Sequence, residues 1–218
     1  LGITLEYIPF SNLASFLQIK QTEVEGLPYY LPVFYVHVYS SMFCLLAGFT
    51  QFNQNVRKRY VKIHRFVGFI YLFVVLGFSA PSGFVMALHA NGGFLASVFF
   101  VTLSLLWWWF TFRAVVEVRR ENYSDHEAFM IRSFALALSA VTLRLWKVVL
   151  VYLFEPSPMN VYVIVAGFVW IPNLLLAEYI IKKKKICRQK CLEIDNSISI
   201  FFYFLSTIKF CIQHFLIR

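Results

Sequence analysis

The chain has 218 residues, of which 60% are hydrophobic and only 14% are charged, and its formal net charge is +9. Soluble domains are about 45–50% apolar and about 25% charged, so this composition excludes an ordinary soluble protein. Because the Lys and Arg residues cluster between long apolar stretches, the positive charge fits membrane topology and argues against nucleic-acid binding.

Five stretches are long and apolar enough to cross a bilayer, which takes about 20 residues in an α-helix. In chain order they lie at about 30–52, 64–89, 94–116, 125–147 and 161–181. Pro81 predicts a break near the outer end of the second stretch. Asn91-Gly92-Gly93 predicts a tight turn after it. The sequence therefore predicts an all-α fold, a polytopic transmembrane helix bundle.

The predicted bundle occupies residues 30–182, between an N-terminal segment 1–29 and a basic segment 183–218. The apolar residues after Ser197 predict either a sixth, C-terminal span or a helix lying at the membrane interface. Because the chain begins with Leu1, we also expect a further segment upstream of it.

The loops alternate in charge along the chain. Basic residues follow the first, third and fifth spans, whereas the turns after the second and fourth spans contain no Lys or Arg. Since basic loops stay in the cytoplasm, this pattern predicts cytoplasmic loops at 53–65, 117–126 and 182–196. Residues 1–29 are then predicted to be extracytoplasmic.

The fourth span is predicted to be the central helix, because it combines apolar length with several charges. A charge at membrane depth costs about 2.5–3.5 kcal/mol on insertion scales, so such residues usually face a bundle interior. We therefore expect Arg132 and Arg144 to lie inside the bundle, about 18 Å apart along the helix axis. The small residues between them, such as Ser133 and Ala137, predict close approach of a neighbouring helix.

Four histidines are predicted to form two layers, one in each half of the membrane. Imidazoles from adjacent helices are the axial ligands that helix bundles offer to b-type haem. The two arginines of the central helix would pair with the haem propionates. The first functional hypothesis is therefore a membrane electron-transfer protein linked to haem b or quinone. Its candidate cofactor-binding residues are His64 and His126 inside, His37 and His89 outside, and Arg132 and Arg144.

Two other hypotheses use overlapping residues. In a zinc-dependent intramembrane hydrolase, His64 and His126 would bind the metal together with Asp125 and Glu127, and a zinc-bound water would attack a lipid or peptide bond. In a non-catalytic accessory subunit, Arg132, Arg144 and Lys147 would bind anionic lipid or a quinone oxygen, or dock a partner subunit or a second copy. The sequence leaves open whether the protein is an enzyme, and it assigns no catalytic residue.

Several motifs of unusual residue types occur in a fixed order. They are Phe34-Tyr-Val-His37, Ala47-Gly48-Phe-Thr-Gln51-Phe52, Lys62-Ile-His64-Arg65-Phe-Val-Gly68, Ser79-Ala-Pro81-Ser-Gly83, Asn91-Gly92-Gly93, and the polar positions from His126 to Trp146. Over roughly residues 10–150, this series resembles the bacterial predicted membrane proteins called domain of unknown function 2306. The resemblance implies a multi-pass protein of the bacterial inner membrane with an additional span before Leu1, and it assigns no activity.

Overall fold

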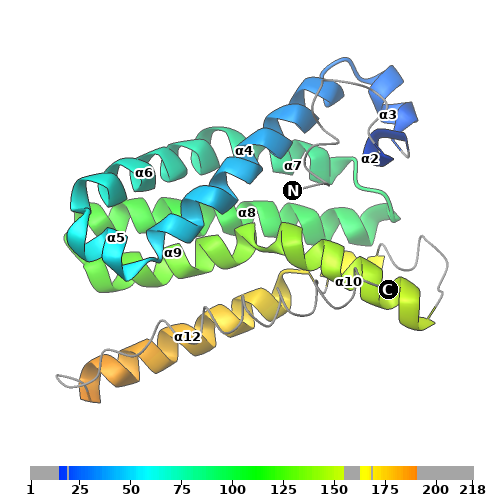
Figure 1. The fold of residues 1–218 in the computed structure, drawn as a ribbon. Helices are drawn as coiled ribbons and strands as arrows, with labels where there is room; N and C mark the ends of the chain where they lie inside the picture. Colours follow the sequence, from blue (N-terminus) through cyan, green and yellow to red (C-terminus); the bar gives the residue numbers. More distant parts are fainter. Residues whose placement is uncertain (1–14, 19, 155–162, 168, 191–218) are drawn as a thin grey trace.

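The computed structural model describes residues 15–18, 20–154, 163–167 and 169–190 (Figure 1). In this part of the chain, five helical segments are long and apolar enough to cross a membrane, and no strand is present. The segments are Tyr30–Gln51, Val61–Leu88, Gly93–Arg119, Tyr123–Leu150 and Val163–Ile186. The predicted all-α bundle of five spans is thus confirmed. The predicted sixth span lies outside the described residues.

The centre of the bundle is a hairpin of two long helices, α8 (Gly93–Arg119) and α9 (Tyr123–Ala137), which α10 (Ser139–Phe154) continues. Contacts with α9 place α12 (Ile171–Lys190) along one side of this hairpin. On the other side pack α4 (Tyr30–Gln51), α6 (Val61–Val74) and α7 (Ala80–Leu88), as Figure 1 shows. The short helices α2 (Ser15–Gln18) and α3 (Gln21–Gly26) lie at one end, and α5 (Gln54–Arg59) lies at the other.

The turns between the helices follow from local sequence. Gly92 and Gly93 have φ angles of 94° and 76°, in the left-handed region that glycine adopts at little cost, and they confirm the predicted turn between α7 and α8. The hairpin turn between α8 and α9 is only three residues long and contains Glu121 at φ 61°. The side chain of Asn122 then accepts a hydrogen bond from the amide of Asp125 and caps α9.

The second span differs from the prediction of a break at Pro81. The helix continues from Val61 to Leu88, with a π-helical turn, η1 (Val75–Ser79), directly before the proline. Proline lacks an amide hydrogen and clashes with the carbonyl of the preceding turn. A π-turn widens the helix by one residue at such a position. The span is therefore locally distorted instead of interrupted.

The fourth span packs closely against the first span in the middle of the bundle. The ring of Phe134 on α9 occupies the space where a side chain at Gly48 on α4 would lie, since a Cβ there would be 2.0 Å from Cε2 of the ring. Phe134 also contacts Phe49 and Phe52, at ring-centroid distances of 5.6 and 5.1 Å. This aromatic group joins α4 to the central hairpin.

The fourth span is regular except at Leu138, which separates α9 from α10. A side chain of α12 bridges this position: Asn173 Nδ2 donates to the carbonyl of Ala135 at 3.2 Å and to Oγ1 of Thr142 at 2.8 Å. Ser139 Oγ donates to the carbonyl of Leu136 at 2.5 Å. Polar side chains thus satisfy backbone groups where the helix changes course.

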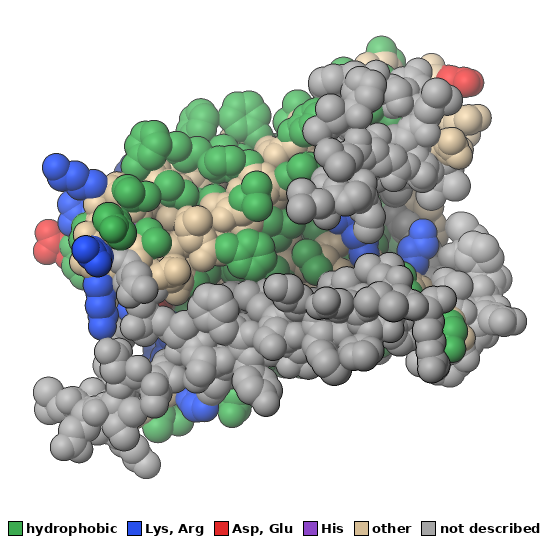
Figure 2. All heavy atoms as spheres, viewed as in Figure 1, with side chains coloured by type: hydrophobic (Ala, Val, Ile, Leu, Met, Phe, Trp, Pro, Cys, Tyr) green, Lys and Arg blue, Asp and Glu red, His purple; other side chains and the backbone are tan. Residues whose placement is uncertain are grey.

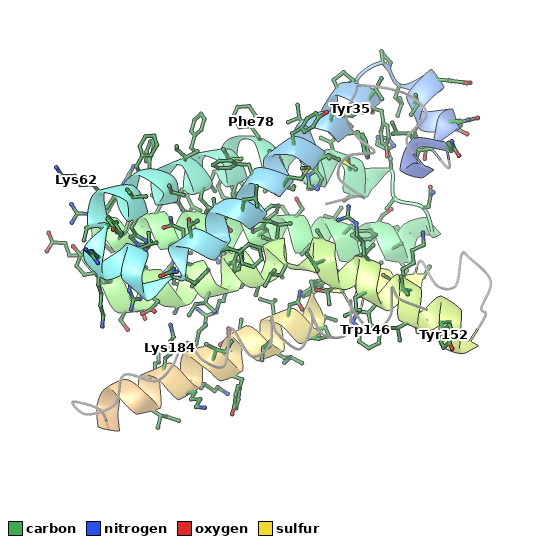
Figure 3. All side chains as sticks on the ribbon, viewed as in Figure 1. Tyr35, Lys62, Phe78, Trp146, Tyr152 and Lys184 are labelled. Carbon is green, nitrogen blue, oxygen red and sulfur yellow. The ribbon has the colours of Figure 1, made fainter. Side chains whose placement is uncertain are left out.

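Positive charge gathers at one end of the molecule, which we call the basic end. It contains Arg57–Arg59 of α5, Arg119, Arg120 and Lys182–Lys185. Figure 2 shows several Lys and Arg side chains, in blue, toward the left, and Figure 3 labels Lys62 and Lys184 there and Tyr35 and Tyr152 toward the opposite end. One end of the bundle is therefore basic, as the loop pattern predicts; its cytoplasmic location stays a prediction.

Candidate functional site

A cavity of about 250 Å³ lies between the helices in the half of the bundle opposite the basic end. Helices α4, α7, α8, α9 and α10 contribute its wall, together with Val169 of the fifth span. Most of the wall is apolar, and Trp107, Leu136 and Leu143 are representative. The polar side chains that line it are Lys20, Tyr30, His37, Ser41, Ser104 and Ser139. An apolar hollow with a few polar groups is the usual form of a small-molecule site.

His37 is held in a fixed orientation at the wall of this cavity. Its Nδ1 lies 2.9 Å from the carbonyl oxygen of Ser79, the last residue of the π-turn η1, and 3.4 Å from Oγ of Ser82. On the other side of the ring, Oγ of Ser41 lies 3.4 Å from Nε2. Gly83 leaves room for the imidazole, because a Cβ there would be 2.9 Å from Cε1 of His37.

Lys20 borders the cavity at its end near α2 and α3, and only 1% of the residue is exposed. Its Nζ forms an ion pair with Oε1 of Glu23 at 2.5 Å and donates to the carbonyl of His89. Burial raises the pKa of the Glu23 carboxyl, but hydrogen bonds from Lys20 and its own backbone, with the lysine charge, outweigh burial and leave this pKa below its usual value.

The two predicted outer histidines have separate partners. The Nε2 of His89 lies 3.1 Å from the hydroxyl of Tyr29, and its ring meets that of Tyr30 edge-on at 6.0 Å. His37 instead contacts α7 and lines the cavity, which His89 does not. In the described part of the chain, no contact joins the two rings, so the structure gives no support to an outer ligand pair.

The two inner histidines lie on different spans, His64 on α6 and His126 on α9. His126 Nδ1 donates to the carbonyl of Ala114 on α8 at 2.8 Å, which leaves its Nε2 available. The Nδ1 of His64 is buried, and no described residue hydrogen-bonds to it. Both members of the predicted pair therefore lie toward the basic end of the bundle.

The carboxylates beside this pair neutralise basic side chains. Glu127 Oε1 accepts hydrogen bonds from Arg57 Nη1 at 3.0 Å and from Lys184 Nζ at 2.7 Å. Asp125 lies 3.9 Å from the ammonium of Lys185. Among the residues that the structure describes, no three of the His, Cys, Asp and Glu side chains gather into a group that could hold a metal ion. The four side chains predicted as zinc ligands thus do not assemble there.

The two arginines of the fourth span have different environments. Arg132 forms a two-point ion pair with Glu178 of α12, with Nε–Oε1 and Nη2–Oε2 distances of 2.5 and 3.0 Å. Its guanidinium also lies over the rings of Phe110 and Phe129. The prediction that Arg144 lies in the interior is wrong, because its side chain is exposed on α10. Twelve residues at about 3.6 per turn rotate the helix by roughly 120°, so the two side chains cannot share a face.

Comparison with known proteins gives a family for this arrangement. A family described as "Predicted membrane protein (DUF2306)" matches residues 34–181. The chain belongs to this family. A segment of 49 residues is 45% identical to Ava biosynthesis cluster protein G of Aspergillus versicolor and covers 22% of this chain but only 14% of that protein. No solved structure matches. The family and the five spans establish a multi-pass membrane protein; the bacterial inner membrane stays a prediction.

The DUF2306 match contains most of the cavity wall, including His37, Gly83, Ser104 and Ser139, and it begins after Lys20. Ser104, Ser139 and Lys20 are not among the site residues that the sequence predicts. The serines carried a signal, since each places a hydroxyl within an apolar span. Lys20 gave no such signal, because it lies in a segment of mixed polar and apolar residues next to a predicted span, where lysine is common.

Proposed function

We propose that this DUF2306 chain binds a small, membrane-soluble ring molecule in the cavity beside His37, and that quinone-type molecules are the class it takes. The observation that carries this proposal is the cavity of about 250 Å³ between the spans. An apolar protein cavity of about 150 Å³ accepts benzene, and pockets for drug-sized ligands span about 300–1,000 Å³. The size therefore suits a single substituted ring.

The apolar and polar residues of the wall would make different contacts with the ligand. Trp107, Leu136 and Leu143 supply apolar surface for the ring, while His37 and Ser104 supply hydrogen-bonding groups for its oxygen substituents. Lys20 closes the end near α3. A quinone-type ligand would connect the protein to membrane electron transfer, and a non-catalytic accessory protein could use the same cavity to sense or carry the ligand.

A substitution at Gly83 tests the cavity. In Gly83→Ala, the new methyl group would lie 2.9 Å from Cε1 and 3.2 Å from Nδ1 of His37, so the imidazole at the cavity wall must shift. We expect affinity for 4-fluorophenol, followed by ¹⁹F NMR of the detergent-purified protein, to fall about tenfold, equivalent to about 1.4 kcal/mol.

The matched control for this experiment is Gly77→Ala, which lies on the same span and has no atom within 4 Å of the added Cβ. It should bind the probe as the unaltered protein does. An unaltered protein that shows no saturable binding of the probe would contradict the proposed function.

A second proposal, b-type haem at His64 and His126, rests on a different observation. The Nδ1 of His126 is anchored by a backbone carbonyl, as in imidazoles that ligate metals through Nε2, and the Nδ1 of His64 is a buried polar atom without a described partner. When bound there, haem would supply one-electron transfer. The chain's own part would be to orient the two rings.

The haem proposal predicts a spectrum. Protein expressed with haem available should show a Soret band and sharp α and β bands after reduction. His126→Ala should lose these bands, whereas His89→Ala, which alters a ring at the opposite end, should keep them. A featureless spectrum from well-folded protein would reject haem and leave the cavity proposal untouched.

A further inference from the structure

The hydrogen bonds of His37 determine what this side chain offers to a ligand. A carbonyl oxygen can only accept, so the contact between His37 Nδ1 and Ser79 O requires the proton to be on Nδ1. In the neutral ring, Nε2 is then an acceptor. None of the hydrogen-bond partners that the structure describes for this imidazole is acidic, and a neutral ring is the less costly form inside a membrane span. The hydroxyl of Ser41 can therefore direct its proton to Nε2 of His37, which leaves the oxygen of Ser41 as an acceptor.

The serines at the cavity wall also have their protons engaged. Ser104 Oγ donates to the carbonyl of Ala80 at 2.7 Å, and Ser139 Oγ donates to the carbonyl of Leu136 at 2.5 Å. Each hydroxyl is left with only acceptor capacity toward the cavity. Ser41 lies 3.4 Å from Nε2 of His37 and is its one described partner there, so it can donate to a ligand only by giving up that contact.

The nitrogen donors near the wall, on Trp107 and Lys20, are not directed at a ligand in the cavity. The Nε1 of Trp107 is buried without a hydrogen-bond partner among the described residues, so it does not open into the cavity. Lys20 is at the end of the cavity, where its ammonium already donates to Glu23 and to the carbonyl of His89. The hydroxyl of Tyr30 can both donate and accept, whereas the three serines of the wall offer acceptors.

From this arrangement, and resting on the proposed function, we infer that the cavity selects ring molecules that carry a hydroxyl group, such as a phenol or a quinol, over the corresponding carbonyl or ether. A hydroxyl can donate to Oγ of Ser41 or to Oγ of Ser104, whereas a carbonyl or ether oxygen would face these acceptors without a hydrogen bond. The cavity would then hold the reduced form of a quinone-type ligand in preference to the oxidised form.

The test compares 4-fluorophenol with 4-fluoroanisole, which has the same fluorinated ring and no donor. Their affinities for the detergent-purified full chain are measured by ¹⁹F NMR. We expect the phenol to bind about tenfold more tightly, the worth of one or two neutral hydrogen bonds. In His37→Phe and in Ser104→Ala, the preference should fall by several-fold. Ser40→Ala, which alters a hydroxyl bonded to the backbone of its own helix, should keep it.

The outcomes distinguish a failure of ring binding from a failure of the preference for hydroxyl groups. If neither probe binds in a saturable manner, the proposed function fails. If both bind with equal affinity, the cavity binds rings and the inference is overturned. A phenol preference that neither His37→Phe nor Ser104→Ala reduces would overturn the assignment of the acceptors. Because Ser104→Ala removes only one oxygen atom, the test holds even if His37→Phe does not fold.

Discussion

Gly48→Ala is expected to prevent stable folding of the bundle. The added Cβ would lie 2.0 and 2.2 Å from two ring atoms of Phe134, distances that real contacts do not reach. The ring cannot withdraw, because it is 1% exposed and packs against Phe49 and Phe52. Overpacking usually costs about 1–3 kcal/mol, and this overlap should exceed about 3 kcal/mol. The measurement is the folded fraction by gel filtration and the free energy of unfolding in SDS.

Two further variants test whether the loss in Gly48→Ala comes from the overlap with Phe134. Gly77→Ala adds the same methyl group where no atom lies within 4 Å, so it should leave the free energy of unfolding nearly unchanged. Adding Phe134→Ala to Gly48→Ala removes the ring that the methyl group would strike. The double variant should therefore lose less than the sum of the two single losses. If Gly48→Ala is as stable as the unaltered protein, α4 and α9 are not in contact at this point.

Glu178→Ala is expected to have the second-largest effect. It would remove both carboxylate oxygens that hold Arg132 and leave a mostly buried guanidinium without its counter-charge. Breaking a fully buried ion pair costs about 3–5 kcal/mol. Since 41% of the Glu178 side chain is exposed, we expect about 2 kcal/mol, measured as the free energy of unfolding in SDS.

The fourth span supplies a matched control for this ion pair. Arg132→Leu in the Glu178→Ala background removes the stranded charge and should recover much of the loss. Arg144→Leu changes the same residue type on the same span at an exposed position, and it should alter the free energy of unfolding by less than about 0.5 kcal/mol. Equal losses for Arg132→Leu and Arg144→Leu would refute the difference in burial between them.

Features set by a short stretch of sequence could be predicted. The five spans follow from apolar length, and the turn at Gly92 and Gly93 follows from residues that tolerate positive φ. The placement of His64 and His126 toward the same end follows from their positions beside the basic loops of two spans. Depth along a span, however, carries no information about lateral position. His37 and His89 belong to the same half of the bundle and yet have different partners.

Features that depend on several segments at once could not be predicted. The cavity takes its wall from five helices and the fifth span, and it exists because no large side chain from any of them fills the space. The tautomer of His37 depends on the carbonyl of Ser79 at the end of the π-turn η1, and no residue pattern in the sequence predicts this π-turn. The wrong prediction for Arg144 has a different origin. Helical periodicity alone places Arg144 about 120° from Arg132, so the sequence already argued against a shared interior face.

The length of α8 sets the depth at which the charged side chains of the bundle lie. Its 27 residues extend about 40 Å, whereas the hydrocarbon layer of a bilayer is about 30 Å thick. Counted from Gly93, the far boundary falls about 20 residues along, at Arg113, the first charged residue of the helix. Arg113 and Glu117, paired at 2.9 Å, therefore reach the headgroup layer. Arg132 lies over Phe110, one turn before Arg113, so we expect its ion pair with Glu178 to lie near the membrane boundary and not at the middle of the membrane.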